Sequence, residues 1–441
     1  MSLQTAWSSS VATMPLYRKT GTVTRVGEMG VEANGPQVSL GEVCALHLGT
    51  GGQVQAEVVA LEQGRVLLMP YARCAGLAVR AQVTALDQHP SVGVGPELLG
   101  RAVDAFAQPL DGGEPIAAMA RMPLHPPPIN PLQRSSIDRP LETGIRVFDA
   151  LLPVGKGQRI GIFSGSGVGK SSLLGMLARN VVADVNVVAL IGERGREVQE
   201  FLAHGLGAEA RRRTVVIAAT SEQPAVVRAR AAYAATAIAE YFRDRGKHVL
   251  LLMDSITRFA MARREIDLAA GQPPTVRGYT PSVFSAIPAL CERGGGLRDG
   301  GSITAMYTVL VDGDDHNEPI ADTLRSSLDG HVVLSRDLAN DGHFPAIDLL
   351  QSVSRLDTVL LGKEDLVMAQ HLRSMLAVHR KQREMVDMGL YKSGTNADLD
   401  AALDRWNDVV AFLRQGLTEV SSLQQTRQRL SQLLAKKVGR P

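Results

Sequence analysis

The chain has 441 residues, more than a single domain usually holds, which predicts two or three domains and a large buried core. Its 47 Lys and Arg residues nearly balance 45 Asp and Glu residues, so no overall field recruits nucleic acid or an anionic membrane. The three cysteines, Cys44, Cys74 and Cys291, lie far apart and form no CxxC pair. This fits a reducing cytosol and predicts neither a disulfide framework nor a zinc site.

The amino-terminal segment is polar, rich in serine and without strong periodicity, so we expect residues 1–20 to form a flexible arm or to fold on a partner. It lacks the basic start and apolar run of a secretory signal. No apolar stretch of the chain approaches the ~20 residues that a transmembrane helix needs. We therefore expect a cytoplasmic protein whose membrane role, if it has one, is peripheral.

From residue 21 the sequence changes to short β-branched runs separated by glycine, which predict a small, mostly antiparallel β-barrel over residues 21–96. The clearest runs are residues 22–26, 54–59 and 64–69. A linker follows, marked by Pro126-Pro127-Pro128 and Pro131 and expected to be extended, because consecutive prolines cannot enter a helix.

The middle of the chain alternates short apolar strands with longer helical patterns, which is typical of a parallel sheet covered on both faces. We expect helices at residues 170–179 and 225–243. The expected strands are residues 159–163, 186–191, 214–219, 249–253, 303–309 and 332–334. From about residue 363 the strands stop, and residues 366–385, 397–414 and 420–435 have the spacing of amphipathic helices.

The first expected strand of this sheet runs into Ser164-Gly-Ser-Gly-Val-Gly-Lys-Ser171 and then into a helix, which is the context of a phosphate-binding P-loop. The glycines allow main-chain N–H groups to curl around a phosphate, and the helix N-terminus adds partial positive charge. Ser164 stands where the strict pattern has glycine. Nucleotide contacts are expected from Gly165, Ser166, Gly167, Val168, Gly169, Lys170, Ser171 and Ser172.

Within this loop Lys170 can reach the β- and γ-phosphates of ATP, and the Ser171 hydroxyl can ligate Mg²⁺. Asp254 ends the apolar strand of residues 249–253 and is a candidate for holding the hydration shell of that metal, although such an Asp alone is more often a helix N-cap. Glu193 follows another strand, where a residue that orients the attacking water belongs. By composition alone, Glu-Arg-Gly-Arg-Glu is also typical of a solvated charged turn.

A fourth run, Gly342-His-Phe-Pro-Ala-Ile-Asp348 leading to Ser352-Val-Ser-Arg355, completes a resemblance. Together with the P-loop, Gly192-Glu-Arg-Gly-Arg-Glu197 and the Leu251-Leu-Met-Asp254 segment, it resembles the rotary ATPase α/β subunit family. The type III protein export branch, which comprises the flagellar and virulence secretion ATPases, is the more similar one. The resemblance covers residue 21 to the C-terminus.

This resemblance implies a multidomain fold. The small β-barrel would be followed by a RecA-like P-loop ATPase domain with a parallel sheet over residues 97–358, linker included, and by a helical C-terminal domain over residues 359–441. It also implies an ATPase that uses ATP and Mg²⁺.

The resemblance further implies roles for single residues. Glu193 would polarise the attacking water, Arg194 would contact phosphate and Asp254 would serve the metal. Phe344 matches an aromatic residue that packs on adenine, with a core position as the alternative. Arg355 matches an arginine finger that one subunit donates to the next, with an exposed or locally paired arginine as the alternative.

Because one chain carries both Glu193 and Arg355, we expect a homo-hexameric ring with a composite site at every boundary. The partners that the resemblance implies are a stator-like regulatory protein at the amino-terminal arm, a central stalk-like coiled coil, chaperone–substrate complexes and the membrane export gate. The expected location is the cytoplasmic face of the inner-membrane export apparatus. The run Gly389-Leu-Tyr-Lys-Ser-Gly-Thr-Asn-Ala-Asp-Leu-Asp400 resembles the flagellar members more than the virulence members.

Two alternatives share parts of this pattern. A Rho-like nucleic-acid translocase also joins a small barrel to a ring ATPase, but the expected barrel is poor in aromatic residues and the charge is balanced, so no nucleic-acid partner is expected. The one dense basic cluster, Arg211-Arg212-Arg213, is interpreted as a solvated turn. A catalytic subunit of a rotary ATP synthase is the second alternative, and the acidic segment typical of its C-terminal region is missing.

Overall fold

The computed structural model describes residues 17–28, 30–49, 51–311 and 318–435. Contacts divide the chain into two compact units. The first consists of Met1–Ser91, Gln223–Val227 and Ala262–Thr280, and the second of Val92–Glu222, Arg228–Met261 and Pro281–Pro441. Residues 1–16 of the predicted arm lie outside the described residues.

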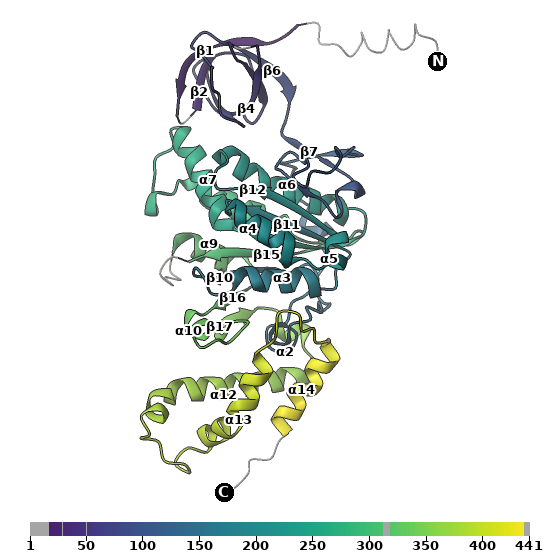
Figure 1. Cartoon of the computed structure of the whole chain (residues 1–441), viewed down its shortest axis with the longest axis vertical. Coiled ribbons are helices and arrows are strands. Elements are labelled where there is room, and N and C mark those ends of the chain that lie inside the picture. The colour runs from purple at the N-terminus through teal and green to yellow at the C-terminus, as the bar shows by residue number, and fades with distance from the viewer. Residues whose placement is uncertain (1–16, 29, 50, 312–317, 436–441) are drawn as a thin grey trace, which may run out of the picture. The chain divides into compact units, whose positions relative to one another are not determined.

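The first unit contains a closed antiparallel barrel of six strands among the described residues, in the order β1-β2-β5-β4-β3-β6 (Figure 1). These are β1 (Thr20–Gly27), β2 (Gly30–Asn34), β3 (Val43–His47), β4 (Gln53–Glu62), β5 (Arg65–Pro70) and β6 (Gln82–Gln88). Gln63 and Gly64, both at positive φ, form the tight turn between β4 and β5, as the right-handed twist of a hairpin requires. Buried side chains such as Val23, Leu46 and Leu68 fill the interior, so the predicted β-barrel is confirmed.

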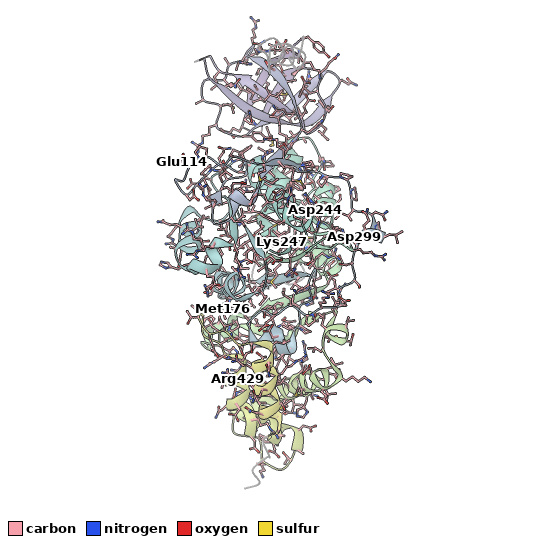
Figure 2. The ribbon with its side chains drawn as sticks, turned by 90° about the vertical axis from the view of Figure 1, so that its right-hand side faces the viewer. Glu114, Met176, Asp244, Lys247, Asp299 and Arg429 are labelled. Atoms are coloured by element: carbon pink, nitrogen blue, oxygen red, sulfur yellow. The ribbon has the colours of Figure 1, made fainter. Side chains whose placement is uncertain are left out.

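The second unit is built around a sheet with the strand order β17-β16-β10-β15-β13-β11-β12-β8. The strands that carry the site are β10 (Arg159–Ser164), β11 (Val185–Ile191), β12 (Thr214–Ala219), β13 (His248–Asp254), β15 (Ser302–Leu310) and β16 (Gly330–Leu334). They pair in parallel, and every strand expected from the sequence is found close to its predicted bounds. Because the strands are parallel, their carboxyl ends lie at one edge of the sheet. Asp244, Lys247 and Asp299, in the turns before β13 and β15, lie together at the opposite edge (Figure 2).

The sheet is not wholly parallel. β17 (Ile347–Ser354) pairs antiparallel with β16, because the chain turns straight back through the short helix α10 (Arg336–Asn340) instead of crossing over. The hydroxyl of Ser352 accepts a hydrogen bond of 2.9 Å from the Val333 N–H across this pair. β14 (Gly295–Gly296) pairs antiparallel with β15, and β8 (Ala102–Val103) extends the other edge beside β12. Outside this sheet, β7 (Ser91–Val94) pairs with β9 (Ala120–Pro123).

Helices flank this sheet, among them α3 (Lys170–Asn180), α6 (Ala225–Arg243) and α7 (Ile256–Ala269) (Figure 1). After β11, residues 192–194 lead into α4 (Gly195–Glu200), which continues without a break into η3 (Phe201–Gly205), a π-helical turn that packs on α3. The interpretation of Arg211-Arg212-Arg213 as a solvated turn is wrong. Arg211 and Arg212 end helix α5 (Ala208–Arg212), and Arg213 donates hydrogen bonds to three main-chain carbonyls.

The C-terminal region is helical, as predicted, and consists of α12 (Lys363–Asp387), α13 (Ala397–Leu413) and α14 (Leu423–Ala435) (Figure 1). Its buried side chains, such as Leu372 and Phe412, belong to the same core as α2 (Arg146–Leu151) and α3. Asn396 caps α13 by accepting from the N–H groups of Asp398 and Leu399. Among the described residues, no helix is both long and apolar enough to cross a bilayer.

Candidate active site

The P-loop lies between β10 and α3, where the sequence predicts it. Gly167 and Gly169 have φ of 78° and 90°, in the left-handed region that glycine adopts without strain. Ser164 is instead the last residue of β10, paired with Leu310 and Leu334, so its position does not require glycine. The side chain of Val168 is buried in the core, which leaves only its main chain to face a phosphate.

Three charged side chains meet beside this loop from different elements. Lys170 begins α3, Glu193 follows β11 and Asp254 ends β13. The Lys170 ammonium lies 2.5 Å from Asp254 Oδ1 and 3.4 Å from Glu193 Oε1. The hydroxyl of Thr308 on β15 donates to the same Asp254 oxygen at 2.7 Å, which holds this carboxylate in place. The parallel sheet therefore brings together three of the residues that the sequence singles out for catalysis and metal binding.

The environment of this cluster shifts the pKa of two of its members. Burial disfavours the Lys170 ammonium, but the carboxylates of Asp254 and Glu193 outweigh it and raise the pKa of Lys170. Burial and the nearby charge of Asp254 raise the pKa of Glu193 to about 7, against the opposing effect of Lys170. A carboxyl group with a pKa near neutral pH is suited to accept a proton or hydrogen bond from water.

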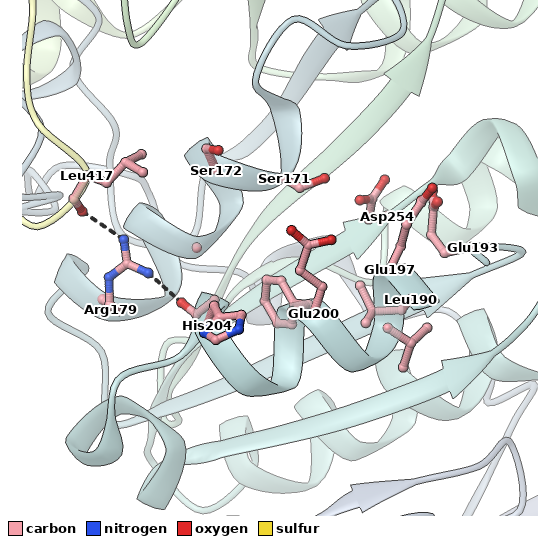
Figure 3. A pocket seen from close by; sticks show the side chains of 14 residues that line it. Ser171, Ser172, Arg179, Leu190, Glu193, Glu197, Glu200, His204, Asp254 and Leu417 are labelled. Carbon is pink, nitrogen blue, oxygen red and sulfur yellow. Dashed lines mark hydrogen bonds between the residues drawn. The ribbon is translucent and has the colours of Figure 1, made fainter. Parts of the chain in front are cut away.

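A pocket of about 330 Å³ opens beside these residues (Figure 3). Ser171 and Ser172 of α3 line one side, with Glu193, Glu197 and Asp254 at one end. Glu200 points into the pocket from α4, and the far end is lined by Arg179, His204 and Leu417 (Figure 3). We call the end at Asp254 the phosphate end, and the end at Leu417, together with the neighbouring Phe344, the base end.

Phe344 lies at the P-loop and outside the core. A Cβ atom placed on Gly169 would lie 3.3 Å from the Phe344 ring, and the side chain is 41% exposed. The carbonyl of Phe344 accepts a hydrogen bond of 2.9 Å from the N–H of Gln415, which follows α13. An exposed aromatic ring at the edge of a phosphate loop is placed to stack on a base.

Of the predicted site residues, Ser171, Ser172, Glu193 and Asp254 line the pocket, while the rest of the P-loop and Phe344 lie beside it and two arginines are exposed elsewhere. The side chain of Arg194 is 75% exposed and lies 3.9 Å from Glu197. Arg355 is exposed just after β17 and donates to the carbonyl of Arg325 at 2.7 Å. Neither side chain lines the pocket. For Arg355 this position leaves the guanidinium available to another molecule.

Arg258 of α7 is a further candidate for contact with an anion. Its side chain crosses Gly192, where an added Cβ would lie 3.0 Å from the Arg258 Cβ, next to Glu193. Its Nε is buried and has no hydrogen-bond partner among the described residues. The sequence offers a weak signal for one further pocket residue, since Glu197 ends the same charged run that contains Glu193. It offers none for Arg179 or Leu417, which reach the pocket from the far end of α3 and from the segment after α13.

The donor set fits Mg²⁺. The Ser171 hydroxyl and the Asp254 carboxylate line one pocket with three further carboxylates, and oxygen is the ligand that Mg²⁺ prefers. No group of three or more His, Cys, Asp or Glu side chains arranged to hold a metal occurs among the described residues. Mg²⁺ usually keeps several waters and binds one or two protein groups plus substrate phosphates, so a serine hydroxyl and one carboxylate fit its needs.

Family models match three successive parts of the chain. The beta-barrel domain of the ATP synthase alpha/beta family matches residues 21–87, and the nucleotide-binding domain of that family matches residues 144–354. The C-terminal domain of the T3SS EscN ATPase matches residues 361–432.

Relatives match over nearly the whole length. A flagellum-specific ATP synthase of Bacillus subtilis is 48% identical over 93% of this chain and 94% of its own. A type 3 secretion system ATPase of Xanthomonas euvesicatoria is 45% identical over 96% of both chains. The solved structure of the assembled ATPase EscN in complex with its central stalk EscO, from the type III secretion system of enteropathogenic E. coli, is 40% identical. It superimposes with a TM-score of 0.87 over 94% of this chain and 100% of that chain.

These matches do not favour a Rho-like translocase or a subunit of an ATP synthase, because the match to the export ATPases includes the C-terminal helices. The chain belongs to the family of flagellum-specific ATP synthases and type 3 secretion system ATPases, and it is an ATPase.

Proposed function

We propose that this protein hydrolyses Mg²⁺-bound ATP as a homo-hexameric ring in type III protein export, with Glu193 as the residue that orients and polarises the attacking water. The observation that carries the proposal is the meeting of Lys170, Glu193 and Asp254 at the carboxyl ends of three strands, beside a P-loop. Export is supported by the full-length similarity to flagellar and secretion ATPases.

In the described arrangement Lys170 contacts two carboxyl groups, those of Glu193 and Asp254. A triphosphate entering the P-loop offers Lys170 a stronger anionic partner, and main-chain N–H groups of residues 165–169 cradle its phosphates. Glu193, released from Lys170, can then accept a hydrogen bond from water as the water oxygen attacks the γ-phosphorus and the bond to the bridging oxygen breaks. Arg258 and Arg194 are the further candidates for contact with the phosphates.

Ser171 and Asp254 would hold Mg²⁺, Ser171 directly and Asp254 through water. When bound, the metal supplies positive charge that offsets the negative charge gathering on the phosphate oxygens. Phe344 would pack on the adenine ring, because it is exposed at the edge of the P-loop.

Arg355 would complete the site of a neighbouring subunit. It lies outside the pocket of its own chain and is exposed. A guanidinium that arrives from a neighbour stabilises transition-state charge only when the ring is assembled, so hydrolysis would depend on assembly. The assembled state of EscN supports a ring for this chain.

In the cell, the ring would act at the cytoplasmic face of the inner-membrane export apparatus. There it would release chaperones and deliver unfolded substrates to the export gate, with a central stalk inside the ring and a stator-like protein at the amino-terminal arm. The stalk is supported by the complex of EscN with EscO. We propose the flagellar system because residues 389–400 resemble the flagellar members. They include the turn that leads into α13, where Tyr391 and Gly394 donate hydrogen bonds to Asp400.

The chemistry is tested by Glu193→Gln and Lys170→Ala, with the exposed Glu209→Gln as the matched control. Glu193→Gln should keep its affinity for a fluorescent ATP analogue and lose roughly 10²–10⁴ in kcat, the contribution of a general base. Lys170→Ala should weaken analogue binding, and Glu209→Gln should change neither quantity. Equal losses of binding in the first two variants would remove Glu193 from the catalytic role.

The biological assignment is tested by deleting the gene in the source bacterium and complementing it with wild type or Glu193→Gln. Loss of filament assembly, restored by the wild type alone, is expected. Normal filaments together with lost secretion of virulence substrates would reassign the protein to that branch.

A further inference from the structure

The two helical segments that border the pocket, α3 and α4–η3, approach each other closely where η3 ends. A Cβ on Gly175 of α3 would lie 3.1 Å from the Gly205 carbonyl oxygen at the end of η3, so glycine permits the approach. One turn further along α3, Arg179 reaches the same carbonyl. The segment from α4 to η3 is therefore held against α3 at its far end and free to open only if that contact is broken.

Arg179 spans three elements with one guanidinium (Figure 3). Its Nη1 donates to the Gly205 carbonyl at 2.6 Å and its Nη2 donates to the Leu417 carbonyl at 2.7 Å. Neither of these partners is a carboxylate, and burial lowers the pKa of Arg179. Partial burial of an arginine against neutral carbonyls has a free-energy cost of desolvation that no ion pair offsets. We therefore attribute the role of Arg179 to the planar, bidentate geometry of its guanidinium.

Leu417 belongs to the segment after α13, which reaches the base end of the pocket. The preceding Gln415 donates its main-chain N–H to the Phe344 carbonyl, and its side chain donates to the carbonyls of Gly144 and Glu419. Arg146 of α2 is buried and donates to Phe412 at the end of α13. The segment is thus fixed to the ATPase part on one side by α2, and on the other by Arg179.

The other prong of Arg179 holds the helix that begins beside Glu193. Gly195 starts α4 two residues after Glu193, and the helix runs without a break to Gly205, roughly 16 Å at 1.5 Å per residue. We infer that Arg179 is a positioning residue that couples the C-terminal helices to the catalytic carboxylate, through the Leu417 carbonyl at one prong and the α4–η3 helix at the other. This inference rests on the proposed role of Glu193.

The coupling has a direct consequence for a partner that moves α13. A displacement of the segment after α13 withdraws the Leu417 carbonyl from Arg179, and the remaining prong no longer fixes the angle of the guanidinium toward Gly205. The π-helical turn of η3 is the part of the helix best able to shift, because its hydrogen bonds are the least regular. Glu193, which precedes the other end of this helix, would then no longer be held at a fixed distance from the P-loop.

The test compares Arg179→Met with Arg179→Lys and with Arg212→Met, an exposed arginine at the end of α5, in the full-length protein. Arg179→Met should lower kcat by roughly 10- to 100-fold, since small misplacements far from the reacting atoms have effects of that size. Arg179→Lys should recover part of the loss, because an ammonium can donate to both carbonyls without the planar fork. Arg212→Met should match wild type, and Tm should stay close to wild type in all variants.

Two readouts separate coupling from a merely structural role. The acid limb of kcat/KM should move to lower pH in Arg179→Met, because a looser α4 exposes Glu193 to water. In a Glu193→Gln background, Arg179→Met should reduce the residual turnover less than twofold, because residues that act through one another are non-additive. If Arg179→Met does not fold, wild type, Arg179→Lys and Arg179→Gln are compared instead. Their kcat values should fall in that order.

A kcat of Arg179→Met within twofold of wild type, or a fall with an unmoved acid limb and full additivity with Glu193→Gln, would overturn the coupling while leaving the proposed function intact. Failure of the proposed function has a different signature, because Glu193→Gln itself would then stay active.

Discussion

The phosphate end and the base end of the pocket are built in different ways. At the phosphate end, charged side chains contact one another, with Lys170 between Asp254 and Glu193. At the base end, Arg179 and Gln415 hold main-chain carbonyls, of Leu417 and of Phe344. The phosphate end depends on the chemistry of its charged side chains. The base end depends on the position of its main chain.

This difference determines what substitution can do at each end. Removing a charged side chain from the phosphate end leaves a buried partner without compensation, which costs more than the pair contributes. At the base end the carbonyls remain whatever side chain is chosen, so a substitution changes positions more than it changes charge. We therefore expect large losses of turnover at the phosphate end and graded changes of affinity and coupling at the base end.

The largest expected effect on kcat comes from Arg355, which lies at neither end of the pocket of its own chain. Arg355→Ala should lower kcat by roughly 10³–10⁵ and leave ATP binding nearly unchanged, because an arginine finger acts on transition-state charge. Arg355→Lys should recover little, since a point charge on a flexible stem does not copy the planar fork. Steady-state hydrolysis of assembled rings and binding of an ATP analogue measure the two quantities, with Arg212→Ala as the matched control.

Mixing two inactive proteins tests whether the finger crosses a boundary. Glu193→Gln subunits carry an intact Arg355, and Arg355→Ala subunits carry an intact Glu193. Rings that contain both should regain activity at boundaries where the two intact residues meet. If mixed rings form and no activity returns at any ratio, the phosphate end is complete within one chain and Arg355 has another role.

The fold could be predicted largely from the sequence because its signals are local. The apolar strands of the sheet, the glycine-separated runs of the barrel and the three C-terminal helices each have their own periodicity, and each is found. The sequence does not predict the antiparallel strand β17, because residues 347–354 stand out only as part of a family motif. Its pairing depends on β16, and a single segment does not specify whether its neighbour runs parallel.

The residues of the phosphate end could be predicted from the sequence, and those of the base end, apart from Phe344, could not. Lys170, Glu193 and Asp254 could be predicted because each follows directly from a strand end, and parallel strands bring those ends together. Leu417 and Arg179 could not, because their contacts join residues 238 positions apart through a carbonyl that every residue possesses. The prediction for Arg213 is wrong for a similar reason, because main-chain carbonyls that accept its hydrogen bonds cannot be recognised in the amino-acid sequence.

The raised pKa of Glu193 predicts how kcat/KM for ATP depends on pH. In its proposed role Glu193 acts as the ionised carboxylate, and burial and the nearby charge of Asp254 raise its pKa to about 7. The kcat/KM for ATP should therefore be maximal above pH 7 and fall about tenfold per unit below it, or about 100-fold by pH 5. The measurement is a pH profile of kcat/KM at saturating magnesium, with Tm followed at each pH to exclude unfolding. An acid limb centred below pH 5, in the ordinary carboxyl range, would contradict the raised pKa.

The smallest expected effect lies at the base end. Phe344→Ala removes a ring that is 41% exposed, so its stacking on a base should contribute near the low end of the range for base–aromatic contacts, about 1 kcal/mol. KM for ATP should rise about fivefold, with kcat and the acid limb unchanged, because the phosphate end is untouched. Phe344→Leu keeps an apolar contact with Gly169 but cannot stack. Its KM for ATP should lie between the values of wild type and Phe344→Ala. KM for inorganic tripolyphosphate, which has no base, is the internal control and should not respond to either substitution. A fall in kcat with an unchanged KM would place Phe344 with the phosphate end, and an equal rise of KM for tripolyphosphate would show that the ring shapes the P-loop rather than the base site.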